Sequence, residues 1–368
     1  MNMYRMKNMA FVGIVALVAV AFWMLASLCI PAFKYPSSDK QLYTIRHQEL
    51  RDNNTLYTDL FLQSIKDNNG YLVLGTSESG SVSGGNYFDF LNADTTLDVR
   101  FSVVAGAGRT ACTYFPLICG NENIENLKVI YYVNPAYWCN KLASSNEDYF
   151  MRYTSYAAMW SAGVGGDKYV DDVIKANRRN ITTADVAADF LSFYFDKIRR
   201  KYYQDLVFDM DSTKFAKGLT FVRPQSEVQK AISFLPPDSS AYNYNLNVSG
   251  SFDVNSYSLH VNTESSYRYD ELRAMIHLCR ERKVDIVFVV GPYNHIAFTK
   301  ANSSELADIQ SICKKILALL DEENATYIDA TGISSVSGTF SDWQHHSSYG
   351  AYLISQKIKN YVVEKENR

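Results

Sequence analysis

The sequence predicts an α/β protein: a doubly wound, mostly parallel sheet flanked by helices, with one N-terminal transmembrane helix and a large helical or irregular insertion. Two observations carry this prediction. Five short apolar runs alternate with helical patterns, and 25 uncharged residues follow one another near the N-terminus. Hydrophobic residues make up 47% of the 368 residues, so the chain can bury a large core. A net charge of −3 provides no basic field, so nucleic acid is excluded as a partner.

The uncharged run, residues 9–33, is long enough to span the hydrocarbon core of a bilayer. Arg5 and Lys7 precede it, and the positive-inside rule therefore places the N-terminus in the cytoplasm. We expect a single-pass protein of the cell membrane, with residues 1–35 as cytoplasmic N-terminus and anchor and residues 36–368 as an extracellular domain. A cleaved signal peptide is the alternative, but the run is longer than the apolar region of most signal peptides.

Apolar runs that end in turn residues predict buried parallel strands. These runs are 71–75, 98–104, 128–133, 284–290 and 326–330. Amphipathic patterns predict helices within 38–67, 109–120, 147–162, 185–203, 267–283, 303–323 and 347–364. The connection between the third and fourth strands is too long for a simple crossover, so we expect residues 140–266 to form an inserted subdomain or lid.

Five cysteines follow the apolar run, at positions 112, 119, 139, 279 and 313. An odd number leaves at least one without a partner in the same chain. We expect buried free thiols, and a Cys112–Cys119 disulfide is the alternative. The sequence has no Cys-x-x-Cys and no His-x-x-x-His pattern, so we expect no metal and no cofactor.

The first motif that suggests chemistry is Gly75-Thr76-Ser77-Glu78, directly after the first strand. Ligands bind beyond the carboxyl ends of parallel strands, and a serine there can lie at a helix N-terminus, which favours negative charge. Its hydroxyl needs a base to become a good nucleophile. A helix cap without chemistry is the alternative for Ser77.

The second motif, Asp342-Trp343-Gln344-His345, precedes the last helix. An aspartate three residues before a histidine can accept the imidazole Nδ1 proton, which leaves Nε2 for Ser77. We therefore expect His345 to be the base and Asp342 its partner, and His346 to be solvated or to face substrate. A surface Asp–His pair is the alternative.

A serine nucleophile also needs donors for the oxyanion that forms in the reaction. Gly106, after the second strand, is the candidate for a backbone donor, with Gly108 as the alternative. Asn134, after the third strand, is the candidate for a side-chain amide. Tight turns without chemistry are the alternative for the same residues.

A serine after the first strand and Asp-x-x-His before the last helix resemble the SGNH (GDSL-like) hydrolases. With the apolar N-terminal run, Gly-Thr-Ser-Glu and Asp-Trp-x-His, the chain is similar to the DltD family, membrane-anchored SGNH-like proteins of D-alanyl teichoic acid biosynthesis. Residues 134–138 and 292–294 are also similar to family segments. The resemblance implies four substrate-binding residues: Glu78, Trp138, Asn294 and His346.

The resemblance implies D-alanylation of lipoteichoic acid at the surface of a Gram-positive cell, with Ser77 as the acyl acceptor, His345 as base and then acid, and Asp342 orienting it. The implied partners are the membrane, lipoteichoic acid or a related glycopolymer, a membrane-bound O-acyltransferase and a D-alanyl carrier protein.

Two other functions remain open. One is an O-acyltransferase or esterase for another surface polysaccharide, and the other is a non-catalytic scaffold that binds teichoic acid. The family usually has Ser-Pro-Gln where this chain has Asn134-Pro135-Ala136, and Leu-Gly-Trp where it has His346-Ser347-Ser348. These departures bear on the acceptor and the acyl group more than on the triad.

Overall fold

The structure, a computed structural model, describes residues 11–22, 25, 43–44, 62–63, 65–79, 86–106, 108–120, 124–139, 167–177, 183–184, 187–188, 190–191, 220–221, 261, 263, 266–301 and 303–367. The predicted parallel sheet is confirmed. Its strands are β2 (Tyr71–Gly75), β3 (Phe101–Ala105), β4 (Lys128–Val133), β6 (Asp285–Val290) and β7 (Tyr327–Asp329). They lie in the order β3-β2-β4-β6-β7, and every neighbouring pair is parallel.

The direction in which the sheet grows reverses between β2 and β4. The chain passes from β2 to β3 on one side and then returns to β4 on the other side of β2. In open parallel sheets, ligands bind at such a point, outside the carboxyl ends of the strands. The residues after Gly75 and after Val133 therefore occupy the place where a site is expected.

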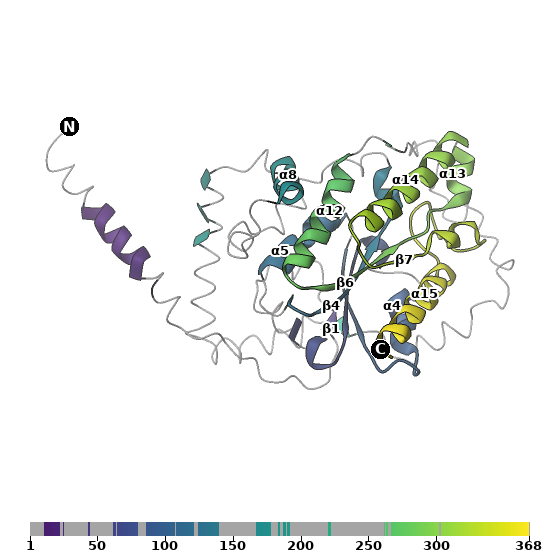
Figure 1. Ribbon diagram of the computed structural model, residues 1–368, viewed down its shortest axis with the longest axis horizontal. Helices are drawn as coiled ribbons and strands as arrows, with labels where there is room; N and C mark the ends of the chain where they lie inside the picture. The colour runs from purple at the N-terminus through teal and green to yellow at the C-terminus, as the bar shows by residue number, and fades with distance from the viewer. Residues whose placement is uncertain are drawn as a thin grey trace.

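Helices cover both faces of the sheet (Figure 1). One face carries α5 (Phe115–Gly120), α12 (Ser266–Glu281), α13 (His295–Ala301) and α14 (Ser303–Glu322). The other face carries α4 (Tyr87–Ala93) and α15 (Ser348–Glu366). Successive β2 residues alternate between the two cores, with Leu72 and Leu74 in the first and Tyr71 and Val73 in the second. Because both faces are buried, the strands appear in the sequence as continuous apolar runs.

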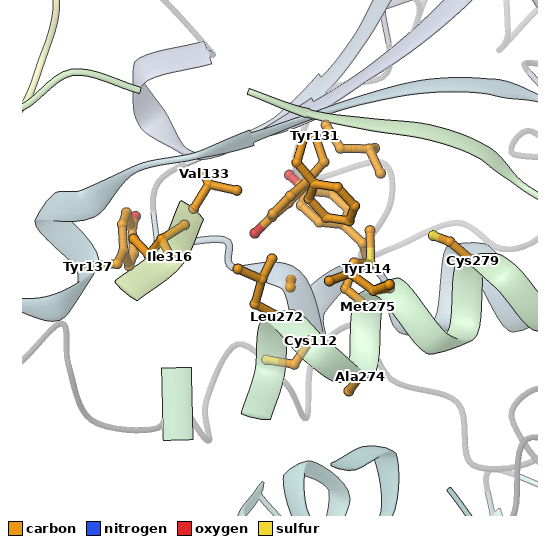
Figure 2. Close-up of a cluster of buried hydrophobic side chains, with 14 of the residues drawn as sticks. Cys112, Tyr114, Tyr131, Val133, Tyr137, Leu272, Ala274, Met275, Cys279 and Ile316 are labelled. Carbon is orange, nitrogen blue, oxygen red and sulfur yellow. The ribbon is translucent and has the colours of Figure 1, made fainter. Parts of the chain in front are cut away.

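The five cysteines beyond the apolar run are free and buried, as expected. Cys112 and Cys279 lie in the first core with Tyr114, Leu272 and Met275 (Figure 2). No bond joins Cys112 to Cys119, since both are free thiols. Burial raises the pKa of the Cys119 thiol to about 12, so it stays protonated and unreactive.

Several elements differ from the sequence prediction. Residues 109–120 divide into a 3₁₀ turn at Ala111–Tyr114 and the helix α5. Short helices α4 and α13, and α8 (Lys168–Asn177) in the insertion, are not predicted from the sequence. The helical prediction for 38–67 is wrong at β1 (Tyr43–Thr44), which pairs antiparallel with β5 (Thr220–Phe221). The chain is helical at the described residues 62–63 and 65–67, and Leu62 and Ile65 are buried there.

Part of the remaining prediction falls outside the described residues. The helix predicted at 147–162 lies outside them, as does most of 140–266. Residues 187–188 and 190–191 of the helix predicted at 185–203 are helical. Residues 11–22 are helical as well, with exposed apolar side chains such as Phe11 and Phe22. Within the ranges given above, no helix has both the length and the apolar character required to cross a membrane.

Gly75 ends β2 at a point where no side chain fits. A Cβ atom on Gly75 would lie 2.1 Å from Ser79 Oγ and 2.7 Å from Ser79 Cβ. Ser79 Oγ is held by a 2.6 Å hydrogen bond with the Tyr87 hydroxyl, so it does not move aside cheaply. The turn that carries Ser77 therefore depends on glycine at position 75.

Gly75→Ala should lower the free energy of unfolding by about 1–3 kcal/mol, because the added methyl group overpacks the turn. Urea denaturation of the full chain measures the change. Gly332→Ala serves as the matched control, since no atom lies within 4 Å of its Cβ position. Equal loss of stability in the two variants would contradict the close approach at Gly75.

Candidate active site

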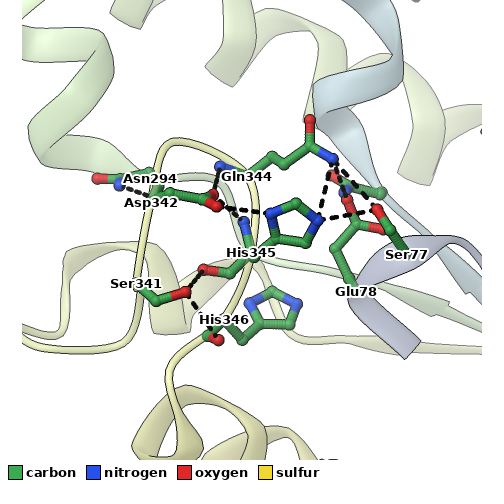
Figure 3. Close-up of polar contacts among 9 residues, drawn as sticks. Ser77, Glu78, Asn294, Ser341, Asp342, Gln344, His345 and His346 are labelled. Carbon is green, nitrogen blue, oxygen red and sulfur yellow. Dashed lines mark hydrogen bonds and ion pairs between the residues drawn. The ribbon is translucent and has the colours of Figure 1, made fainter. Parts of the chain in front are cut away.

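Three side chains from two distant parts of the chain meet at the carboxyl edge of the sheet (Figure 3). Ser77 begins the 3₁₀ turn Ser77–Ser79 after β2, and Asp342 and His345 lie in the loop between β7 and α15. His345 Nε2 lies 2.9 Å from Ser77 Oγ, and His345 Nδ1 lies 2.6 Å from Asp342 Oδ2. With its Nδ1 proton directed to Asp342, the imidazole presents Nε2 to accept the Ser77 proton.

The Asp342 carboxylate also folds the loop that carries it. Its Oδ1 accepts the backbone N–H groups of Gln344, at 2.8 Å, and of His345, at 2.6 Å. The Asp342 carbonyl accepts from Asn294 Nδ2 at 2.7 Å, while Asn294 Oδ1 accepts the Ala297 N–H at the start of α13. Asn294 is buried and positions this loop through these two hydrogen bonds. Its substrate-binding role stays a prediction.

The surroundings of His345 and Asp342 shift the pKa values of the two side chains in opposite directions. Burial disfavours the imidazolium, but the hydrogen bond and charge of Asp342 outweigh it, so the pKa of His345 is raised above its ordinary value. Burial also disfavours ionised Asp342, and its bonds to His345 and Gln344 outweigh that cost, so the pKa of Asp342 is lowered. Asp342 is therefore the charged partner of an imidazole that accepts protons readily.

Glu78, beside Ser77, is fully buried. Its Oε1 accepts from Asn134 Nδ2 and, at 3.1 Å, from Gln344 Nε2. Its Oε2 has no hydrogen-bond partner among the described residues. Burial raises the pKa of Glu78 to about 7, against the opposing effect of His345. Glu78 is therefore enclosed beside the nucleophile in this structure, and its substrate-binding role stays a prediction.

The two residues expected to form the oxyanion hole follow strands next to β2, and both make hydrogen bonds within the protein. Asn134 is buried, donates to Glu78, and accepts the Ala136 N–H at 2.9 Å, which caps the 3₁₀ turn Pro135–Trp138. Gly106 follows β3, the neighbour of β2, and its carbonyl accepts from Arg109 N–H at 3.2 Å. The oxyanion roles of Gly106 and Asn134 stay predictions.

Two of the expected substrate-binding residues belong to the protein interior. Trp138 is buried, lies 5.3 Å from the Tyr269 ring between centroids, and lines a cavity of about 30 Å³ with room for one or two water molecules. His346 is fully buried with Nε2 against the Tyr132 hydroxyl, which corrects the expectation of a solvated residue. Burial lowers the pKa of His346 to about 3, so its imidazole is neutral.

The orientation of His346 follows from the loop backbone. The N–H of Ser341 donates to His345 O at 2.9 Å, and the N–H of Ser347 donates to Thr339 O at 3.0 Å. This short antiparallel pairing turns adjacent side chains to opposite sides. His345 therefore faces Ser77 while His346 faces the sheet.

Gln344 belongs to the site, although it is not among the residues that the sequence predicts there. Its Nε2 lies 3.3 Å from Ser77 Oγ and 3.5 Å from His345 Nε2. Gln344, His345, Asp342 and Ser77 are all partly exposed, so a ligand can reach them. The signal for Gln344 is only its place inside Asp-Trp-x-His, beside the expected base.

A parallel α/β sheet with serine, histidine and aspartate joined at its carboxyl edge is the arrangement that serine hydrolases and acyltransferases use. The family model described as DltD protein matches residues 240–363, which confirms the resemblance to the DltD family over that part of the chain. This match includes Asn294, Asp342 and His345, and it does not reach Ser77.

Solved structures give weaker likenesses. An acetyl xylan esterase, AlAXEase, has a TM-score of 0.38 at 10% identity, with 80% of this chain and 99% of that chain covered. The extracellular lipase from Streptomyces rimosus has a TM-score of 0.35 at 12% identity, with 80% and 99% covered. Neither likeness is close enough to bear on function. No curated protein matches the chain.

Glu78→Gln should flatten the dependence of stability on pH. In the wild type the folded chain keeps the Glu78 proton up to about pH 7, whereas an unfolded glutamate loses it near its ordinary value of 4.5. Raising the pH across this window therefore destabilises the wild type, by up to about 3 kcal/mol. Urea unfolding at about pH 5 and about pH 7 gives the change in the free energy of unfolding with pH for the wild type and for Glu78→Gln. Glu322→Gln, at an exposed carboxylate, is the control, and equal slopes in wild type and Glu78→Gln would rule out a raised pKa.

Proposed function

We propose that this protein is a membrane-anchored, extracellular acyl-transfer enzyme that uses Ser77, His345 and Asp342 in the D-alanylation of lipoteichoic acid. The observation that carries the proposal is the chain of contacts from Ser77 Oγ through both ring nitrogens of His345 to Asp342. The DltD match supports the choice of acyl group and polymer. The uncharged run 9–33 and the exposed apolar side chains of the helix at 11–22 support an anchor with a cytoplasmic N-terminus.

In the first half of the reaction, Ser77 Oγ attacks the carbonyl carbon of an activated D-alanyl ester or thioester. The new C–O bond forms as the serine proton passes to His345 Nε2 and the carbonyl electron pair moves to its oxygen. The bond to the leaving group then breaks, and the leaving group takes the proton from His345. Asp342 stabilises the imidazolium throughout and keeps its own charge.

In the second half, a hydroxyl of lipoteichoic acid attacks the Ser77 ester and gives its proton to His345. The bond between the acyl carbon and Ser77 Oγ breaks, and Ser77 recovers the proton. A membrane-bound O-acyltransferase and a D-alanyl carrier protein are the partners that the DltD resemblance supports. Donor and acceptor are then both at the membrane, which is where the anchor holds the site.

The same chemistry on another surface polysaccharide is the second candidate. The observation that favours it is the sequence Asn134-Pro135-Ala136 beside the site, where the DltD family usually has Ser-Pro-Gln. The side chain of Asn134 contacts Glu78, one residue from the nucleophile, so this departure lies close to the reacting atoms.

Ser77→Ala should reduce D-alanine on the envelope polymers to the level of a gene deletion, because loss of a triad nucleophile costs roughly 10⁴- to 10⁶-fold in turnover. The deletion strain receives wild type, Ser77→Ala, or Ser335→Ala as a matched exposed-serine control, with equal protein in the membrane fraction. Alkali-labile acyl groups are released and identified by mass spectrometry.

Each result assigns the function differently. D-alanine restored by wild type and Ser335→Ala, but not by Ser77→Ala, supports the proposal. A change in acetate or another acyl group, with D-alanine constant, moves the activity to another polysaccharide. Full restoration by Ser77→Ala overturns the nucleophile and favours a scaffold that binds the polymer.

A further inference from the structure

The amide of Gln344 reaches the reacting atoms directly. Its Nε2 contacts Ser77 Oγ at 3.3 Å and Glu78 Oε1 at 3.1 Å (Figure 3). An amide nitrogen carries two hydrogens, so one N–H can be held by Glu78 while the other faces the serine. In the tetrahedral intermediate the oxyanion is bonded to the same carbon as Ser77 Oγ. A donor already in contact with Oγ therefore lies next to the position that the oxyanion takes.

Two groups fix this amide in place. The Asp342 carboxylate accepts the Gln344 backbone N–H at 2.8 Å, so the residue that orients the base also orients the backbone of Gln344. Glu78 Oε1 holds the side-chain end of Gln344, and the same oxygen also accepts from Asn134 Nδ2. A donor held before the reaction is what oxyanion stabilisation needs, because no reorganisation is then required at the transition state.

The charge state of Glu78 suits this arrangement. A carboxylate next to a developing oxyanion would repel it, whereas a protonated carboxyl does not. Burial raises the pKa of Glu78 to about 7, which favours the neutral acid in mildly acidic surroundings. Its carbonyl oxygen still accepts from both amides.

Asn134, the expected amide donor, is placed differently. It is 4% exposed, and its contacts are with Glu78 and the Ala136 N–H. Gln344, in contrast, is partly exposed beside Ser77. The geometry points to Gln344 as a catalytic residue that donates to the oxyanion, with Glu78 as its positioning residue. This inference rests on the proposed role of Ser77 as nucleophile.

The donor role of Gln344 is tested by labelling the full chain, in isolated membranes, with a fluorophosphonate. Ser77 Oγ displaces fluoride from phosphorus, its proton passes to His345, and the phosphoryl oxygen takes the place of the oxyanion. Varying the probe concentration separates the rate of bond formation from probe binding. Gln344→Ala should slow bond formation by about 10²- to 10³-fold with little change in probe binding. Gln63→Ala, at a glutamine whose amide donates to Asp67 far from the site, is the matched control and should label at the wild-type rate.

The positioning role of Glu78 predicts coupling between the two residues. Glu78→Ala should slow bond formation, and the double variant Glu78→Ala/Gln344→Ala should be no slower than Gln344→Ala alone. Glu78→Gln keeps an oxygen for the Gln344 amide and should recover most of the rate that Glu78→Ala loses. If Glu78→Ala does not fold, Gln344→Ala still tests the donor role, and the same cycle with Glu78→Gln and Glu78→Gln/Gln344→Ala measures the coupling.

The labelling results distinguish a failure of the Gln344 role from a failure of the Ser77 role. Wild-type labelling by Gln344→Ala overturns the donor role of Gln344. Fully additive losses in the double variant overturn the positioning role of Glu78. Both results leave Ser77 as the nucleophile. Labelling that persists in Ser77→Ala, or is absent in wild type, removes the nucleophile and with it both proposals. A lowered melting temperature in Gln344→Ala, together with weaker probe binding, would also overturn a catalytic role.

Discussion

One carboxylate organises the whole site. Asp342 accepts three N–H groups: the His345 ring nitrogen and the backbone amides of Gln344 and His345. These bonds are local, within three residues, yet they decide how the loop meets a serine 268 positions away. A carboxylate so well provided with donors stays charged, and its fixed geometry sets the imidazole tautomer. Removing the Asp342 carboxylate would free the base and the adjacent amide together.

The topology decides where this loop arrives. Ser77 follows β2 and Asn134 follows β4, the two strands on either side of the reversal in strand order. Glu78 connects the two strand ends, because its Oε1 accepts from Asn134 and from Gln344 of the loop. Burying such polar groups is costly unless their hydrogen bonds are satisfied, and the shared acceptor meets this requirement for both amides. A polar network thus joins the ends of β2 and β4 to the loop that carries His345.

The sequence was informative where the physics is local or periodic. Both faces of the sheet are buried, so β4 and β6 appear as apolar runs, and Asp342 and His345 lie at a spacing with a direct structural meaning. Short helices such as α4, at seven residues, give too few turns to show a period. Gln344 carries no signal by itself, because its contact with Ser77 appears only when the loop has folded. His346 was assigned to the wrong side for the same reason, since the pairing of Ser347 with Thr339 is not visible in one sequence.

The two acids of the site, Asp342 and Glu78, have opposite surroundings, and their pKa values are shifted in opposite directions. Donors lower the pKa of Asp342, while burial raises that of Glu78 to about 7. Two carboxyls whose pKa values are pushed apart can take different roles at one pH. Below about pH 7, the imidazolium of His345 then has one full counter-charge, on its Nδ1 side, and Glu78 adds no competing charge on the side of Ser77. In that pH range, developing negative charge on a substrate meets a neutral acid and an amide, and this arrangement favours acyl transfer at Ser77.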